Sequence, residues 1–391
     1  MSLPRQNTLV LALLIGLATL PDALVPIALK SAVVDRWGVS LSTAVLFAGV
    51  ALLGAVLVLP LIQFLDRSRS PGWTIAWASI VNAIVLAIMA APVSLGTAMV
   101  LRLIAGGMDM ITLAVLLGLL ERGDPTRSGH RFGPASLALM LGLSLGFALG
   151  GAVAKAMGGQ IFLLSAAFSV LLAVAAGGSR GLLSTVTALP MMARNRVRYW
   201  PALAFHFADR GVSAILAVPL TLFLIEEAGV GERIVGLAMS MVLLCIALGA
   251  WPAGVLADRL GPLPVRILGV TGYAMGFAAL AGAPAFPEWG ILAILVFLGV
   301  FGAGLAPSMY VLAARRNGGA IDMGGVNAAG AAGYLVGTLV SGAVMYWRET
   351  TTDASGIQLL LLGGATVYLL INMPAIAALA GWRVRSGLSG I

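Results

Sequence analysis

Apolar residues in this chain form runs that are too long and too uniform for a soluble protein. The runs last roughly 20 residues, the length that an α-helix needs to cross a bilayer, and short segments with Gly, Pro or charged residues separate them. The pattern predicts an all-α polytopic membrane protein with twelve spans, at about residues 8–30, 40–64, 73–93, 95–120, 132–156, 159–178, 199–225, 234–256, 264–283, 291–314, 324–346 and 356–381.

The composition agrees with a chain surrounded by lipid. It is 60% hydrophobic and 10% charged, whereas soluble domains carry about 25% charged residues. Nothing in it resembles a phosphate loop, a nucleotide-binding fold or a catalytic triad, so we predict neither an enzyme nor a cofactor. The single cysteine, Cys245, excludes an internal disulfide, and two histidines are too few for a His-rich metal site.

The net charge of +8 comes from 21 Arg and 2 Lys residues that lie mostly in the short loops. This placement indicates membrane topology, and we predict no binding to nucleic acid. Loops on one side, including those with Arg259 and Arg266, hold 16 of these residues and loops on the other side hold 5, while Arg102 and Arg210 lie within spans. Because Lys and Arg favour the cytoplasmic side, we predict cytoplasmic termini and a bacterial cytoplasmic (inner) membrane.

The two halves of the chain resemble each other. Their division predicts a first six-helix bundle at 1–178, a cytoplasmic linker at 179–198 and a second six-helix bundle at 199–391. Four glycines of the fifth span have counterparts 191 residues later in the eleventh span. The pairs are Gly133 and Gly324, Gly142 and Gly333, Gly146 and Gly337, and Gly151 and Gly342. Two parallel repeats are typical of one large class of transporters, with the substrate site between the halves.

The segment from Gly254 to Gly261 reads G-V-L-A-D-R-L-G and follows the eighth span. It resembles the loop signature G-x-L-A-D-R-x-G of the major facilitator superfamily. The resemblance implies that Asp258 and Arg259 latch neighbouring helices on the cytoplasmic side, although a simple polar turn would also account for them. The corresponding loop of the first half keeps Asp66 and Arg67 but lacks both glycines.

Two further motifs carry the same resemblance. Arg102-Leu-Ile-Ala-Gly106 in the fourth span is similar to the family's R-x-x-x-G pattern, although Arg102 could instead extend its side chain to the outer interface. The fifth span is similar to the family's antiporter motif G-x8-G-x3-G-P-x2-G-G, with Phe147 in place of Pro. That similarity implies export, but close helix packing would equally explain the glycines. They are Gly133, Gly142, Gly146, Gly150 and Gly151.

Ionisable residues within the spans are the remaining functional signal, because charge inside a membrane is costly and usually has a role. We expect Asp22, Arg102 and Asp109 to form a coupling centre for protons. For Asp209 and Arg210, a site role and a local charge pair stay open, and Asp22 could also belong to a helix break with Pro21. The expected lining of the central cavity is completed by His206, Tyr310, Asn327 and Tyr334.

The resemblance implies a secondary active transporter that moves a small organic molecule by alternating access, with proton-coupled export as the main hypothesis. One alternative is an importer of an organic anion or a siderophore-like chelate, with Arg102 or Arg210 meeting a substrate carboxylate. Another is a membrane assembly or receptor protein that transports nothing, since the same fold can serve different functions. The expected partners are the substrate, a proton or other coupling ion, and lipid, and we expect a monomer without metal.

Overall fold

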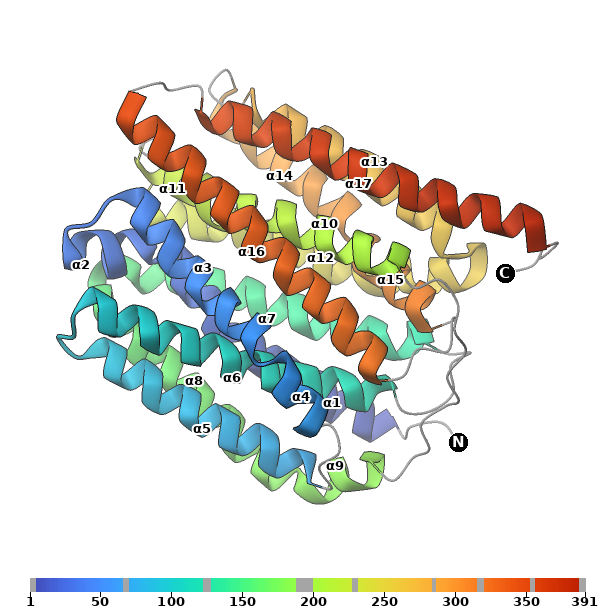
Figure 1. Cartoon of the computed structure of the whole chain (residues 1–391), viewed down its shortest axis with the longest axis horizontal. Coiled ribbons are helices and arrows are strands. Elements are labelled where there is room, and N and C mark those ends of the chain that lie inside the picture. Colours follow the sequence, from blue (N-terminus) through green and yellow to red (C-terminus); the bar gives the residue numbers. More distant parts are fainter. Residues whose placement is uncertain are drawn as a thin grey trace.

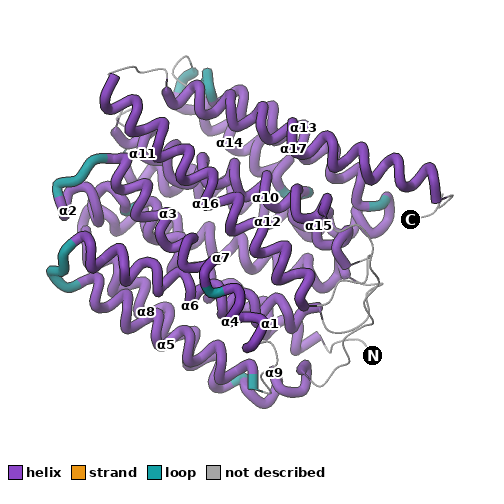
Figure 2. The backbone as a smooth tube through the Cα atoms, in the orientation of Figure 1, coloured by secondary structure: helices purple, strands orange, loops and turns teal. Residues whose placement is uncertain are grey.

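The chain folds into a bundle of long helices joined by short loops (Figure 2). A computed structural model describes residues 5–65, 70–121, 128–187, 200–226, 231–282, 286–314, 320–351 and 356–386. All regular structure within these ranges is helical. Helices are expected in membrane-spanning segments, because they satisfy their own backbone hydrogen bonds where no water is present.

The structure confirms the twelve predicted spans. Within the described ranges, eleven segments are long and apolar enough to cross a membrane, and one of them, Gly133–Gly178, holds two helices. The helices of the first half are α1 (Arg5–Ile27), α3 (Leu41–Leu57) with α4 (Leu59–Leu65), α5 (Pro71–Ala90), α6 (Leu95–Glu121), α7 (Ser128–Met157) and α8 (Ile161–Gly178). Those of the second half are α10 (Trp200–Ile215) with α11 (Thr221–Glu226), α12 (Glu232–Leu260), α13 (Pro262–Leu280), α14 (Glu288–Gly302) with α15 (Leu305–Ala314), α16 (Ala320–Thr351) and α17 (Gly356–Ser386).

Pro21 does not break the first helix. Helix α1 continues through both Pro21 and Pro26 to Ile27. By contrast, a π-helical turn at Leu216–Leu220 separates α10 from α11 and contains Pro219. Proline lacks the amide hydrogen that a regular helix needs at that position, which is a common cause of such local widening.

The expected latch segment is not a loop. Helix α12 extends to Leu260, so Asp258 and Arg259 lie on its last turn, and only Gly261 stands outside it. Gly261 has a φ of 88°, a left-handed conformation that glycine adopts without strain. Pro262 then begins α13, because its fixed φ suits the first turn of a helix. The prediction of a polar loop between these spans was therefore wrong.

The two halves lie side by side, with the first half blue to green and the second half yellow-green to red (Figure 1). Helix α3 packs against α16, and α7 packs against α12, so these four helices form the main contact between the halves. The start of α1 and the end of α17 lie at the same end of the bundle, as an even number of spans requires. Within the predicted linker, residues Arg180–Thr187 form a further helix, α9, which packs on α5.

Candidate functional site

The structure brings Asp22, Arg102 and Asp109 together in the first half. Arg102 Nη2 lies 3.7 Å from Asp22 Oδ1, and the side chains are 7% and 36% exposed respectively. The carboxyl group of Asp109 interacts with Arg102 and lies within hydrogen-bonding reach of Asp22. The three groups thus form one electrostatic cluster between α1 and α6, with Asp22 as its most accessible acid. Arg102 is buried and does not extend to the outer interface.

Asn82 on α5 holds Asp109 in this cluster and was missed by the sequence analysis. Its Nδ2 donates to Asp109 Oδ1 at 2.6 Å and to Ser169 Oγ on α8 at 3.4 Å. Asn82 is only 3% exposed. A single amide within an apolar span is a signal that could have found it, because a buried polar group needs a partner.

Tyr334 on α16 connects this cluster to the second half of the chain. The guanidinium group of Arg210 on α10 lies 5.0 Å from the centre of the Tyr334 ring. Tyr334 also interacts electrostatically with Asp22 and Arg102 of the first half. Among the described residues, Arg210 forms no ion pair with a carboxylate. Of the two alternatives left open for Asp209 and Arg210, the local charge pair between them is therefore not formed.

His206 lies near both Tyr310 and Arg210. The two rings have centroids 6.4 Å apart, and His206 interacts electrostatically with Arg210. A Cβ atom at Gly330 on α16 would lie 2.2 Å from the His206 ring, so glycine at this position makes room for the imidazole. Asn327 is half-buried on α16, two helical turns before Tyr334.

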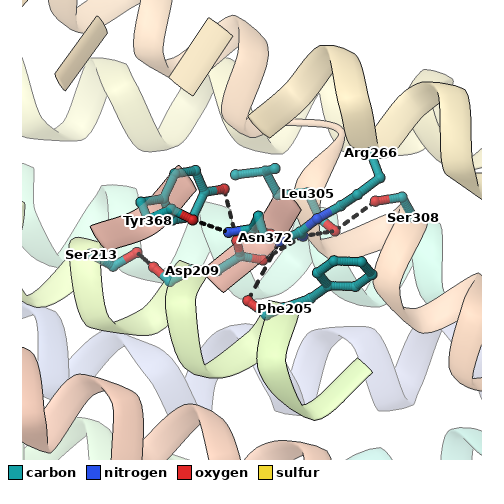
Figure 3. Close-up of polar contacts among 8 residues, drawn as sticks. All are labelled: Phe205, Asp209, Ser213, Arg266, Leu305, Ser308, Tyr368 and Asn372. Carbon is teal, nitrogen blue, oxygen red and sulfur yellow. Dashed lines mark hydrogen bonds and ion pairs between the residues drawn. The ribbon is translucent and has the colours of Figure 1, made fainter. Parts of the chain in front are cut away.

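The partner of Asp209 is Arg266, as Figure 3 shows. Arg266 Nη1 and Nη2 donate to the two carboxylate oxygens at 2.7 Å each. Nη2 also donates to Asn372 Oδ1 at 2.5 Å, and the Tyr368 hydroxyl donates to Asp209 Oδ1 at 2.9 Å. The guanidinium carbon lies 4.3 Å from the centre of the Phe205 ring. This network joins α10, α13 and α17 in the core of the second half.

The assignment of Arg266 to a cytoplasmic loop was wrong, because its side chain has no exposed surface. The sequence interpretation began the ninth span at about residue 264 and assigned an arginine so near its start to the loop. In the structure α13 already begins at Pro262, so Arg266 lies on its second turn and points into the bundle. The charge bias that sets the orientation becomes fifteen to five.

The glycines of the fifth span lie at close helix contacts. A Cβ atom at Gly142 would lie 2.2 Å from the carbonyl oxygen of Gly16 on α1, and one at Gly146 would lie 2.6 Å from that of Leu20. Gly150 faces α1 in the same way, while Gly133 and Gly151 face α12. Helix packing explains all five positions, whatever the direction of transport.

The candidate latch residues are only partly described. Asp258 is half-buried and Arg259 is exposed on the end of α12, while Gly254 is buried one turn earlier. Asp66 and Arg67 lie outside the described residues. Within the described ranges, no group of three or more His, Cys, Asp or Glu side chains could hold a metal ion.

Comparisons with known proteins place this geometry in context. Residues 200–388 match the model of the Major Facilitator Superfamily. The nucleoside transporter NupG has 16% identity and a TM-score of 0.67, over 95% of this chain and 99% of NupG. The proton:xylose symporter XylE, bound to 6-bromo-6-deoxy-D-glucose, has 14% identity and a TM-score of 0.70, over 95% of each chain. No curated protein sequence matches the chain.

At these identities the solved structures show a common fold and nothing about the substrate. The fold is that of Major Facilitator Superfamily transporters, with twelve helices in two bundles. With its apolar spans, the chain is an integral membrane protein.

Proposed function

We propose that this chain, whose second half matches the Major Facilitator Superfamily and which shares that fold over 95% of its length, is a proton-coupled secondary active transporter of a small organic molecule. The observation that carries the proposal is the contact between Asp22 and Arg102 at 3.7 Å, with Asp109 within hydrogen-bonding reach of Asp22. Asp22, Asp109 and Arg102 would be the coupling centre, and transport would proceed by alternating access between the two bundles.

The chemistry of the cluster suits a proton carrier. A hydrogen bond between the carboxyl groups of Asp22 and Asp109 requires that one of them holds a proton. When Asp22 is ionised it attracts Arg102, and when it gains a proton that attraction is lost. The 3.7 Å contact is longer than a charge-assisted hydrogen bond, so little rearrangement is needed to break it. Asn82 keeps Asp109 in place during this exchange.

The direction of transport is a separate part of the proposal. The glycine spacing of α7 supports export. The helix contacts of these glycines neither strengthen nor weaken that prediction. A second candidate, import of an organic anion, is favoured by Arg210, which has no carboxylate partner among the described residues. The charge bias of the loops supports cytoplasmic termini in a bacterial inner membrane. We further propose that the protein acts as a monomer.

The test is transport by the full-length protein in proteoliposomes with an imposed pH gradient. The probes are radiolabelled gluconate and quinate as monoanions, xylose and uridine as neutral molecules, and choline as a cation. At least one probe should accumulate. The Asp22→Asn or Asp109→Asn variant should lose accumulation but retain exchange down a concentration gradient. Asp35→Asn is the matched control, because Asp35 is exposed beyond the first span. Full accumulation by both variants would contradict the assignment of the coupling centre.

A further inference from the structure

Two arginines from opposite halves of the chain have unfilled hydrogen-bonding capacity near Tyr334. Arg210 on α10 contacts the Tyr334 ring and, among the described residues, has no carboxylate partner. Arg102 on α6 is 5% exposed, and its Nε has no hydrogen-bond acceptor. Tyr334 interacts electrostatically with both. A guanidinium group in a membrane protein needs an anionic or polar partner, so Arg210 and the Nε of Arg102 can bind a further acceptor group.

The charged groups that face this region can be counted. Arg102 and Arg210 are positive, and Asp22 and Asp109 are negative when ionised. His206, Tyr310 and Tyr334 complete the surroundings as polar rings. Asp209 and Arg266 neutralise each other behind Phe205 and add no net charge. With both acids ionised and the imidazole neutral, the region is neutral; one proton shared between the acids leaves it with one positive charge.

We infer that the site binds a small organic monoanion, with its carboxylate between Arg210 and Arg102 beside Tyr334, and carries it together with one proton. The inference rests on the proposed function and names the substrate class for the same site. Arg and carboxylate groups form strong paired hydrogen bonds, and the Tyr334 hydroxyl can donate another. A singly charged carboxylate fits better than a doubly charged phosphate, because one proton provides one positive charge.

Charge balance explains why proton and anion would move together. The empty site with both acids ionised is neutral, and so is the site that holds one proton and one monoanion. The site with only the proton carries one positive charge, and the site with only the anion carries one negative charge. Burying such a net charge between the closing halves is unfavourable. The two neutral states therefore reorient, and the result is electroneutral symport of one proton with one monoanion.

The coupling centre and the anion site would also cooperate directly. A proton on Asp22 removes its attraction for Arg102, so Arg102 becomes available to the substrate. Bound substrate then occupies Arg102 and favours the protonated acid. Proton and anion thus help each other to bind, which gives symport, whereas export by antiport would require competition. An inward proton gradient would accumulate the anion inside, so this inference supports the import candidate.

The experiment measures uptake of the five probes into proteoliposomes that contain the wild-type protein, under an inward pH gradient. A potassium gradient with valinomycin sets the membrane potential independently. The variants are Arg210→Gln, Arg210→Lys and the control Arg233→Gln, which removes an exposed guanidinium group near the start of α12. Thermal unfolding of each variant in detergent checks that it is folded. The selectivity of the wild-type protein tests the substrate class even if Arg210→Gln does not fold.

We expect gluconate or quinate to accumulate with the pH gradient and to be unaffected by the potential. Arg210→Gln should lower the initial rate of monoanion uptake by about tenfold, since a hydrogen-bonded charge is lost. Arg210→Lys should retain part of the wild-type rate, and Arg233→Gln should retain all of it. Accumulation of xylose, uridine or choline without either monoanion would overturn this inference and leave proton-coupled transport standing. Monoanion uptake that follows the potential would overturn electroneutrality. If no probe accumulates, the inference and the proposed function both fail.

Discussion

Arg266 binds Asp209 through two hydrogen bonds of 2.7 Å, whereas Arg102 contacts Asp22 only at 3.7 Å. Tyr368 adds a further hydrogen bond to the Asp209 carboxylate, and Arg266 is fully buried. A buried pair with this many partners holds helices together and has little freedom to exchange protons. These two arginine–aspartate contacts therefore suit different purposes: the first suits a structural role, and the second suits the proposed role in coupling.

We predict that Arg266→Gln destabilises the protein by roughly 3–5 kcal/mol, because it leaves the buried Asp209 carboxylate without its countercharge. Thermal unfolding in detergent should show a much larger loss than for Arg102→Gln, whose partner Asp22 is partly exposed. A double variant, Arg266→Met with Asp209→Leu, should regain much of the stability. Equal losses for the two single variants would contradict the structural assignment of this pair.

Gly106 of the Arg102 motif brings α6 against α3. A Cβ atom at Gly106 would lie 1.8 Å from the carbonyl oxygen of Ala51, and one at Gly54 would lie equally close to that of Leu103. Gly106→Ala should therefore separate the helices and destabilise the protein by about 1–3 kcal/mol, measured by thermal unfolding. Gly96→Ala is the control, since Gly96 on α6 has open space around it. The explanation fails if the two variants unfold alike.

Glu349 joins the halves at the end of the bundle opposite the termini. Its carboxylate, on α16, accepts hydrogen bonds from the Ser42 amide at 3.1 Å and the Ser42 hydroxyl at 2.8 Å, at the start of α3. Glu349→Gln should weaken closure on that side, because hydrogen bonds to a charged group contribute about 1.5–3 kcal/mol. A cysteine introduced at Ser40, in a protein with Cys245 replaced by Ala, should then react faster with a water-soluble maleimide.

The control for this closure is Thr350→Val, because Thr350 is exposed and its hydroxyl bonds only to its own helix. Its labelling rate should match that of the parent protein. An unchanged rate in Glu349→Gln would show that Glu349 does not help to close this end.

Asp258 should stabilise the state closed to the cytoplasm more than Asp66 does, because only the second-half segment carries the full motif. Asp258→Asn and Asp66→Asn can be compared by the reactivity of a cysteine introduced at Thr8, which is half-buried near the start of α1, in the same cysteine-free background. We expect faster labelling in Asp258→Asn. An equal or larger effect of Asp66→Asn would rule out the unequal latch.

Topology can be tested with reporter fusions in the predicted linker, after residue 190, and in the loop before Glu288. The linker should lie in the cytoplasm and the loop outside, because the arginine-rich loops follow the positive-inside rule. A reporter active only outside and one active only in the cytoplasm should give opposite results at the two sites. The same result at both sites would refute the orientation and the number of intervening spans.

Most of the fold could be predicted from hydrophobic runs, since the bilayer permits few alternatives. The positions at which the helices are interrupted could not be predicted in this way. The separation of α3 from α4 near Val58 and the π-helical turn with Pro219 depend on local backbone geometry. Likewise, α12 and α13 are separated by Gly261 alone, so a search for a polar loop placed both helix ends too far apart.

The site could be predicted where a charged residue lies within an apolar span. Asp22, Arg102 and Asp109 were recognised for this reason, because apolar packing does not account for them. Partners were harder to find, because they come from other helices. Tyr368 and Asn372 are four residues apart and face the same way on α17, yet only the three-dimensional arrangement shows that both meet Asp209 and Arg266. Asn82 was overlooked for the same reason.

The contact between α7 and α12 has a consequence for how the two halves move. At Gly151 and Gly236 the backbones nearly touch, since a Cβ atom at either position would lie 2.8–2.9 Å from main-chain atoms of the facing helix. No side chain interlocks there, so a change of tilt requires no rotamer changes at this point. If the halves rock as alternating access requires, this glycine pair would serve as a pivot, and the polar contacts elsewhere between the halves would set the energy barrier.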